Sequence, residues 1–163
     1  MEKTPYFGYG LNRNPEFLQA LLGRIPDIYD QTSILKDHEL RIQRLDDLPE
    51  LSRRIIGKAY GSDFRSYVIY MSLGKEVGGT TWAIKPEELA ILNYWELEGD
   101  WHNLAEIVIT GSVGEYSALT HICKYDKGIA VPDSINYPDF IVCREKIIRS
   151  ANNIDWLFWK KDM

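Results

Sequence analysis

The chain has 163 residues, 45% of them hydrophobic and 26% charged, which is the composition of an ordinary soluble globular protein. Its 19 Lys and Arg against 24 Asp and Glu give a net charge of −5 with no basic run, which argues against nucleic acid as a partner. There is no signal peptide pattern and no run of about 18 apolar residues, so we expect a cytoplasmic protein with no membrane partner. The length suits one hydrophobic core, and we expect residues 1–163 to form a single domain.

The first predicted elements are a short strand and a well-marked helix. The aromatic segment Thr4–Tyr9 is typical of a strand that runs into a turn at Gly10. Asn14 is a good helix cap, Pro15 suits the first helical position, and Gly23 suits the helix stop. We therefore expect a helix over NPEFLQALLGR.

The middle of the chain predicts mostly strands. Residues 25–45 alternate loosely, and Leu35, Leu40 and Ile42 are expected to face inward from one or two strands. LPELSRR is compatible with a helix. IIGKAY and SYVIYM are predicted to be short strands separated by the turn GSDF, and GKEVGGTTWAI is predicted to end in a further strand.

The second half predicts a helix, a hairpin and a closing helix. Pro86 stops strand pairing and suits the first turn of a helix, which we expect to reach about Trp95. GSVG between two β-rich runs predicts an antiparallel hairpin over residues 105–125. From Tyr137 onward apolar residues recur at helical spacing, and Trp156 and Trp159 are expected to pack back onto the body. Strands with few helices between them indicate an α+β fold.

Metal and nucleophile chemistry find little support. His38, His102 and His121 have no metal-ligand spacing, although Asp100-Trp101-His102 is the nearest approach to a ligand cluster. Cys123 and Cys143 are too few and too far apart for a zinc ribbon, and are expected to be reduced, buried thiols. We therefore expect no metal and no cofactor.

Glu96 is the candidate for proton transfer. On a helix that begins at Pro86 it shares a face with Leu89 and Leu92, whereas Glu98 points roughly the other way. A carboxylate beside Leu and Trp side chains loses hydration, which raises its pKa toward neutrality and suits it to take and return a proton. The alternative is that Glu96 only caps the helix or forms a salt bridge at its end.

Three motifs together resemble the γ-glutamylcyclotransferase family, also called AIG2-like. YFGYGLN is similar to the family's opening Tyr-Phe-x-Tyr-Gly-Ser-Asn, and GRIP to its Gly-Arg-x-Pro step. LNYWE is similar to its Leu-Asp-x-x-Glu motif. The order and spacing of the three agree with the family. The resemblance implies a small mixed β-barrel with surrounding helices, and a pocket beside the first loop.

The resemblance also implies an activity. Such an enzyme cuts a γ-glutamyl amide without water, because the α-amino group of the glutamyl unit attacks its own side-chain carbonyl and closes 5-oxoproline. The implied partner is a small γ-glutamyl amide or peptide. No cofactor is needed, because the attack is intramolecular.

Site residues follow from the resemblance position by position. The catalytic Glu falls on Glu96. The loop expected to line the glutamyl end of the substrate, with main-chain N–H groups free for its carboxylate or for an oxyanion, comprises Tyr6, Phe7, Gly8, Tyr9, Gly10 and Leu11. Asn12 and His121 are expected to support the site, His121 standing where the family often presents a Tyr.

Two positions depart from the family pattern. Leu11 replaces the family's Ser, and Asn93 replaces its Asp. Two other functions therefore remain open. One is a noncatalytic module on the same fold that binds a metabolite or a protein. The other is a hydrolase or lyase in which Glu96 activates water and leaves open-chain glutamate.

Overall fold

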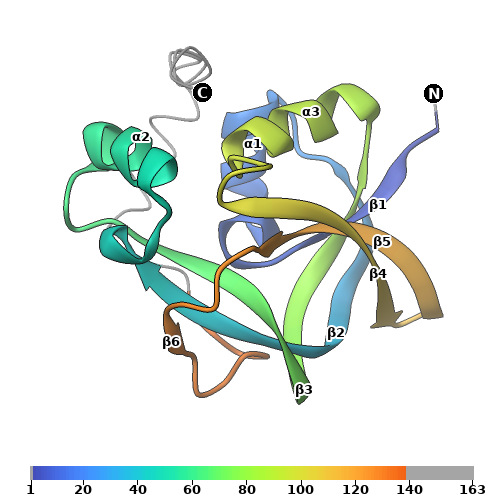
Figure 1. Cartoon of the computed structure of the whole chain (residues 1–163). Coiled ribbons are helices and arrows are strands. Elements are labelled where there is room, and N and C mark those ends of the chain that lie inside the picture. Colours follow the sequence, from blue (N-terminus) through green and yellow to red (C-terminus); the bar gives the residue numbers. More distant parts are fainter. Residues whose placement is uncertain (1, 139–163) are drawn as a thin grey trace.

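Five strands form a closed ring in the computed structural model, which describes residues 2–138 (Figure 1). The ring order is β3-β1-β5-β4-β2, and pairing of β2 with β3 closes it. β1 and β5 run parallel, while the other ring neighbours run antiparallel, so the barrel is mixed. The strands are β1 (Thr4–Gly8), β2 (Asp27–Arg44), β3 (Arg65–Ile84), β4 (His102–Gly111) and β5 (Gly114–Cys123), and β6 (Ile129–Ala130) adds to β2.

β2 and β3 are long strands that pair along most of their length. Their register runs from Asp27 opposite Ala83 to Arg44 opposite Arg65 and shifts at three places, one of them next to Asp37, whose φ is 58°. Such shifts bend a strand, which lets one pair serve two parts of a small barrel. The segment predicted as one or two strands is thus a single strand, in which Leu35 and Leu40 are buried and Ile42 is half-buried.

The helices cover one end and one side of the barrel. They are η1 (Gly10–Arg13), α1 (Pro15–Leu22), η2 (Leu45–Asp47), α2 (Glu50–Tyr60) and α3 (Pro86–Trp95). The predicted start and stop of α1 are confirmed: Asn14 Oδ1 accepts from the Phe17 N–H at 3.1 Å, and Gly23 has a φ of 79°. The predicted helix from Pro86 to Trp95 is confirmed as well.

Two predictions in the middle of the chain are corrected by the structure. SYVIYM and the strand at the end of GKEVGGTTWAI are parts of the single strand β3. IIGKAY is the second half of α2 and not a strand. Ser52, Ile55, Ile56 and Tyr60 are buried, which is the spacing of one helical face. A short apolar run does not distinguish a buried helix from a strand by periodicity alone, and here packing of this face decides for the helix.

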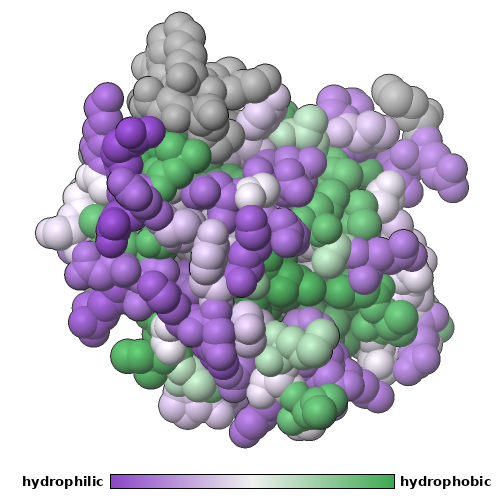
Figure 2. All heavy atoms as spheres, in the orientation of Figure 1, coloured by the Kyte–Doolittle hydropathy of each residue, from purple (hydrophilic) through white to green (hydrophobic). Residues whose placement is uncertain are grey.

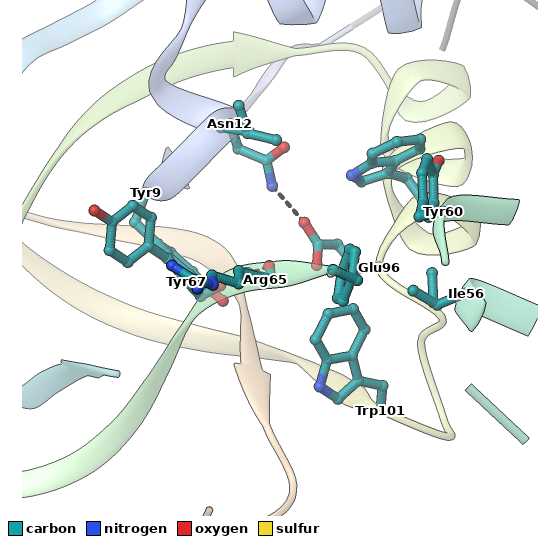
Figure 3. Close-up of a pocket in the computed structure, with 12 residues that line it drawn as sticks. Tyr9, Asn12, Ile56, Tyr60, Arg65, Tyr67, Glu96 and Trp101 are labelled. Carbon is teal, nitrogen blue, oxygen red and sulfur yellow. Dashed lines mark hydrogen bonds between the residues drawn. The ribbon is translucent and has the colours of Figure 1, made fainter. Parts of the chain in front are cut away.

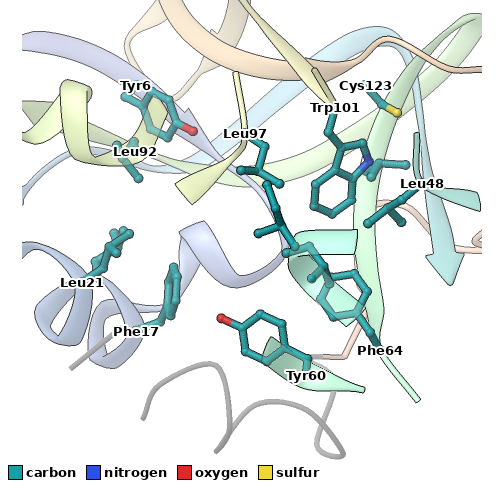
Figure 4. Close-up of a cluster of buried hydrophobic side chains, with 14 of the residues drawn as sticks. Tyr6, Phe17, Leu21, Leu48, Tyr60, Phe64, Leu92, Leu97, Trp101 and Cys123 are labelled. Carbon is teal, nitrogen blue, oxygen red and sulfur yellow. The ribbon is translucent and has the colours of Figure 1, made fainter. Parts of the chain in front are cut away.

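Two apolar clusters hold the barrel and the helices together. The first lies between the helices and the barrel and includes Phe17, Tyr60, Leu92 and Trp101 (Figure 4). The second is formed mainly by strand residues and includes Phe7, Leu40 and Ile69. The buried Cys123 belongs to the first cluster, as predicted for a buried thiol.

The predicted hairpin is confirmed as β4 and β5 joined at Ser112-Val113. In the view of Figure 2 polar side chains predominate on the side of α2, with some apolar ones among them, and a larger group of apolar side chains lies toward the opposite side. Within residues 2–138 we find no helix with the length and apolar character needed to cross a membrane. The predicted closing helix beyond Tyr137, with Cys143, Trp156 and Trp159, lies outside the described residues.

Candidate active site

Glu96 is the first residue after α3. The helix begins at Pro86, where the Glu88 carboxylate accepts from the Lys85 N–H at 2.9 Å. It ends at Trp95, and the N–H of Glu96 still donates to the Leu92 carbonyl at 2.9 Å. Arg24, in the GRIP step, donates to Glu88 at 2.9 Å through Nη2 and so ties the end of α1 to this helix. Glu96 is therefore carried on an anchored element.

The side chain of Glu96 is largely removed from water, as predicted. Its exposed fraction is 13%, whereas Glu98 is exposed. Burial raises the pKa of Glu96 to about 7, and the hydrogen bond from Asn12 Nδ2 to Oε1, at 2.6 Å, opposes this rise. The carboxyl group is thus poised to gain or lose a proton near neutral pH.

His102 lies beside Glu96 without neutralising it. Its Nδ1 is 2.9 Å from the Glu96 carbonyl oxygen and 3.5 Å from Oε2. Burial lowers the pKa of His102 to about 4, so the ring is neutral at pH 7 and its Nδ1–H donates to the carbonyl. No ion pair with a charged histidine therefore stabilises the carboxylate.

The loop after β1 folds back tightly at Gly8. A Cβ atom at this position would lie 2.2 Å from the Asn12 carbonyl oxygen and 3.0 Å from Trp82 Nε1. The same carbonyl accepts from the Trp82 indole N–H at 2.8 Å. The missing side chain therefore makes room for the protein's own backbone, and this packing holds Asn12 in place.

One main-chain donor expected to be free is occupied. The N–H of Gly10 donates to the Tyr137 hydroxyl at 3.0 Å, and this hydroxyl donates to the Gly78 carbonyl at 2.9 Å. Arg13 stacks on the Tyr137 ring, with its guanidinium carbon 3.8 Å from the centroid. The N–H of Leu11 lies in the first turn of η1, where a helical N–H has no intrahelical acceptor.

A pocket opens between this loop, α2, the start of β3 and the end of α3 (Figure 3). Half of its lining residues are aromatic, and Glu96 and Arg65 are its charged members. The lining residues are Tyr9, Leu11, Asn12, Ile56, Tyr60, Phe64, Arg65, Ser66, Tyr67, Trp95, Glu96 and Trp101.

The structure brings four of the predicted site residues to this pocket: Tyr9, Leu11, Asn12 and Glu96. The other five are not among the lining residues. Tyr6 and Phe7 are buried in the two apolar clusters, and Gly8 and Gly10 shape the loop. His121 is fully buried and contacts Tyr6 and Asn93.

Sequence reasoning missed the wall opposite the loop. These residues belong to no recognised motif and come from the end of α2, the connection after it and the beginning of β3: Tyr60, Phe64, Arg65 and Tyr67. The available signal was compositional, since three aromatic residues fall within eight positions here. The prediction of a strand at IIGKAY did not place these residues at the pocket, because Ile56 and Tyr60 reach the pocket from one face of a helix.

The turn Asp100-Trp101-His102 supports the pocket through hydrogen bonds and packing, and not as a set of metal ligands. The Asp100 carboxylate accepts from the Ser52 N–H at 3.0 Å, in the first turn of α2. Trp101 lines the pocket and donates to Gln43 Oε1 at 2.8 Å. Within residues 2–138 no three His, Cys, Asp or Glu side chains gather in a way that could hold a metal ion.

Comparison with protein-family models and with curated proteins finds no match. Solved structures do match. A structure described as γ-glutamyl cyclotransferase superposes with a TM-score of 0.63 at 17% identity, over 99% of this chain and 86% of that one. The chain has the γ-glutamylcyclotransferase-like fold.

Two further structures share the γ-glutamylcyclotransferase-like fold. An uncharacterized protein from Homo sapiens gives a TM-score of 0.62 at 16% identity, over 99% of this chain and 87% of that one. A protein from Arabidopsis thaliana gives 0.58 at 16% identity, over 96% and 89%. At these identities the likeness concerns the fold alone and assigns no activity to this chain.

Proposed function

We propose that the protein is a γ-glutamyl cyclotransferase that releases 5-oxoproline from a small γ-glutamyl amide or peptide. The observation that carries the proposal is Glu96: a buried carboxyl group with a pKa of about 7 on the wall of a pocket beside the first loop. The γ-glutamylcyclotransferase-like fold supports it.

The first step is removal of a proton from the substrate. A γ-glutamyl compound carries its α-amino group as an ammonium with a pKa of about 8. Glu96, with its pKa of about 7, is matched to accept this proton at neutral pH. The freed amine attacks the γ-carbonyl carbon of the same molecule, so the pocket needs only to hold the substrate folded.

The second step returns the proton. The carbon–nitrogen bond to the leaving group breaks, and protonated Glu96 delivers its proton to the leaving nitrogen. The attacking nitrogen also gives up a further proton to the leaving amine, which departs as an ammonium ion. The products are 5-oxoproline and this ammonium ion, no water is consumed, and Glu96 returns to its starting state. The Leu11 N–H is the candidate donor to the oxyanion that forms between the two steps.

A noncatalytic binding module is the second candidate. The observation in its favour is that Tyr137 already occupies the Gly10 N–H, which removes one donor from the loop. Such a module would bind a γ-glutamyl compound and leave it intact.

The decisive experiment is incubation with γ-glutamyl amines, γ-glutamyl amino acids and glutathione, with mass spectrometry of the products. We expect 5-oxoproline from at least one of them. Open-chain glutamate would instead indicate hydrolysis, and binding without any product would favour the binding module.

Two matched variants assign the role of Glu96. Glu96→Gln should lower kcat by roughly 100-fold or more, since general acid–base catalysis contributes factors of about 100 to 10,000. Glu98→Gln removes an exposed carboxylate two residues away and should keep wild-type turnover. Retention of most of the rate by Glu96→Gln would remove Glu96 from the mechanism.

A further inference from the structure

A row of hydrogen-bonded polar side chains leads from Glu96 back to α3. Asn12 Nδ2 lies 2.6 Å from Glu96 Oε1 and 3.4 Å from the Tyr6 hydroxyl. The hydroxyl is 2.7 Å from His121 Nδ1, and His121 Nε2 is 2.9 Å from Asn93 Oδ1. Tyr6, Asn12 and His121 are each at most 4% exposed. Four side chains thus connect the carboxylate to the third turn of the helix that carries it.

The direction of this row, meaning which group donates and which accepts in each hydrogen bond, is determined from its Asn93 end. Burial, with His102 nearby, lowers the pKa of His121 to about 3, so the ring is neutral and carries one N–H. An amide oxygen only accepts, so the proton lies on Nε2 and Nδ1 is an acceptor. Burial also raises the pKa of Tyr6, which therefore keeps its proton and donates it to Nδ1.

The same direction follows from the Glu96 end. An ionised carboxylate only accepts, so Asn12 must turn its amide nitrogen toward Oε1. The second N–H on that nitrogen faces the Tyr6 oxygen, which is free to accept because its own proton points to His121. Both ends thus require the same orientation of the Asn12 amide.

This orientation leaves the amide oxygen of Asn12 unused. Asn12 Oδ1 is buried and has no hydrogen-bond partner within residues 2–138. A buried acceptor without a donor is costly, and in a native protein it points to a missing partner. Asn12 lines the pocket next to Glu96, and Figure 3 shows its nitrogen directed at the carboxylate and its oxygen directed away.

We propose that Asn93 and His121 are positioning residues that fix the direction of this row, so that Asn12 offers its N–H to Glu96 and its carbonyl oxygen to the substrate's α-ammonium group. The contact between Asn12 and the substrate's α-ammonium group depends on the proposed function, whereas the direction of the row does not. The ammonium group would then contact both the base that takes its proton and a neutral acceptor that orients it.

Two residues of the row also stand at positions where the family pattern differs from this chain. Asn93 and His121 both differ from the residues that the family presents, and they are hydrogen-bonded to each other. Asn93 is therefore hydrogen-bonded to a histidine, and an uncharged side chain at position 93 faces an uncharged imidazole ring.

The direction of the row can be tested without any substrate. NMR of the full-length protein labelled with ¹⁵N-histidine distinguishes a protonated Nε2 from a protonated Nδ1. We expect His121 to carry its proton on Nε2 at pH 7. A proton on Nδ1 would reverse the row and overturn the inference, whatever the activity of the protein.

The role of the row is tested by two substitutions at Asn93. Asn93→Gln keeps a neutral amide acceptor for Nε2–H and should change KM by less than about threefold. Asn93→Leu removes it and should raise KM about tenfold, the equivalent of one hydrogen bond. Asn93→Leu should also raise the pKa of Glu96, because the Asn12 hydrogen bond lowers this pKa. The acidic limb of the pH profile of kcat/KM, which reflects ionisation of Glu96, should therefore move to higher pH.

Asn103→Leu, at an exposed position of β4, is the matched control and should change neither quantity. If Asn93→Leu only lowers the melting temperature and leaves KM and the pH limb unchanged, the row is structural and the inference fails. If the wild type has Nε2–H but cleaves no γ-glutamyl compound, the proposed function and the contact with the α-ammonium group fail together. The direction of the row then stands.

Discussion

Gly8 is the position where an added methyl group would meet the most crowding around the site. Its contacts, 2.2 Å to the Asn12 carbonyl and 3.0 Å to the Trp82 indole nitrogen, involve a backbone atom and a buried ring that cannot move aside cheaply. Gly8→Ala should therefore displace Asn12 and lower the free energy of unfolding by about 3 kcal/mol. Urea denaturation measures this change.

Gly57→Ala is the matched glycine control for this prediction. A Cβ atom at Gly57 meets only the end of the Leu45 side chain, at 3.3 Å, and alanine favours the helix. We expect a change within about 1 kcal/mol. Equal effects of the two substitutions would show that crowding at Gly8 is not special.

Single residues also show the limits of sequence reasoning. Glu96 could be predicted because helical spacing places it on an apolar face and a motif surrounds it. Arg65 could not, because nothing local in the sequence says that the start of β3 faces the end of α3. The Gly10 N–H was expected to be free because its acceptor, Tyr137, is 127 positions away.

At the scale of elements, α2 depends on a residue outside it. The helix has no capping side chain at Pro49, and Asp100, in the turn after α3, accepts from the Ser52 N–H and hydroxyl instead. Asp100→Ala should destabilise the protein by about 1 kcal/mol, the usual value of a cap. Because Ile56 and Tyr60 reach the pocket from α2, KM should rise more than kcat falls. Thermal melting and steady-state kinetics measure both.

The control for this prediction is Asp46→Ala, at an exposed position of η2, the short helix that precedes α2. It should leave melting and KM unchanged. If Asp100→Ala changed neither quantity, α2 would be held by its buried face alone.

Elements with local signals were predicted and those decided by packing were not. α1 and α3 each begin with proline and have their own caps, and the β4–β5 hairpin has its turn sequence. α2 has a glycine in its middle and no local cap, so its sequence gives no clear helix signal. IIGKAY is helical because its apolar face packs against the barrel. The long pairing of β2 with β3 likewise depends on strand bends at the register shifts. No residue pattern predicted these shifts.

For the whole molecule, burial of Glu96 makes stability depend on pH. An unfolded glutamate titrates near 4.5 and Glu96 near 7, so between these values the folded state holds a proton that the unfolded chain has released. Stability from this group is therefore present below pH 4.5 and lost as the pH rises through 7. The loss amounts to roughly 3 kcal/mol.

His102 and His121 act in the opposite direction. Their pKa values, about 4 and about 3, lie below 6.5, so acidification below pH 6.5 favours the unfolded chain. Comparison of wild type with Glu96→Gln removes this shared background. From pH 5 to pH 8 the wild type should lose stability relative to the variant, measured by urea denaturation at each pH. A constant difference would mean that the pKa of Glu96 is not raised.

The parallel pairing of β1 with β5 sets the order in which the protein can become functional. Tyr6 and His121 are 115 positions apart, and such distant contacts form slowly because a long loop must first close. β1 can pair with β3 first, but its parallel pairing with β5 forms only after the long intervening segment has closed. Emergence of binding or turnover during refolding would thus report the final closure of the ring, not the earlier formation of its helices.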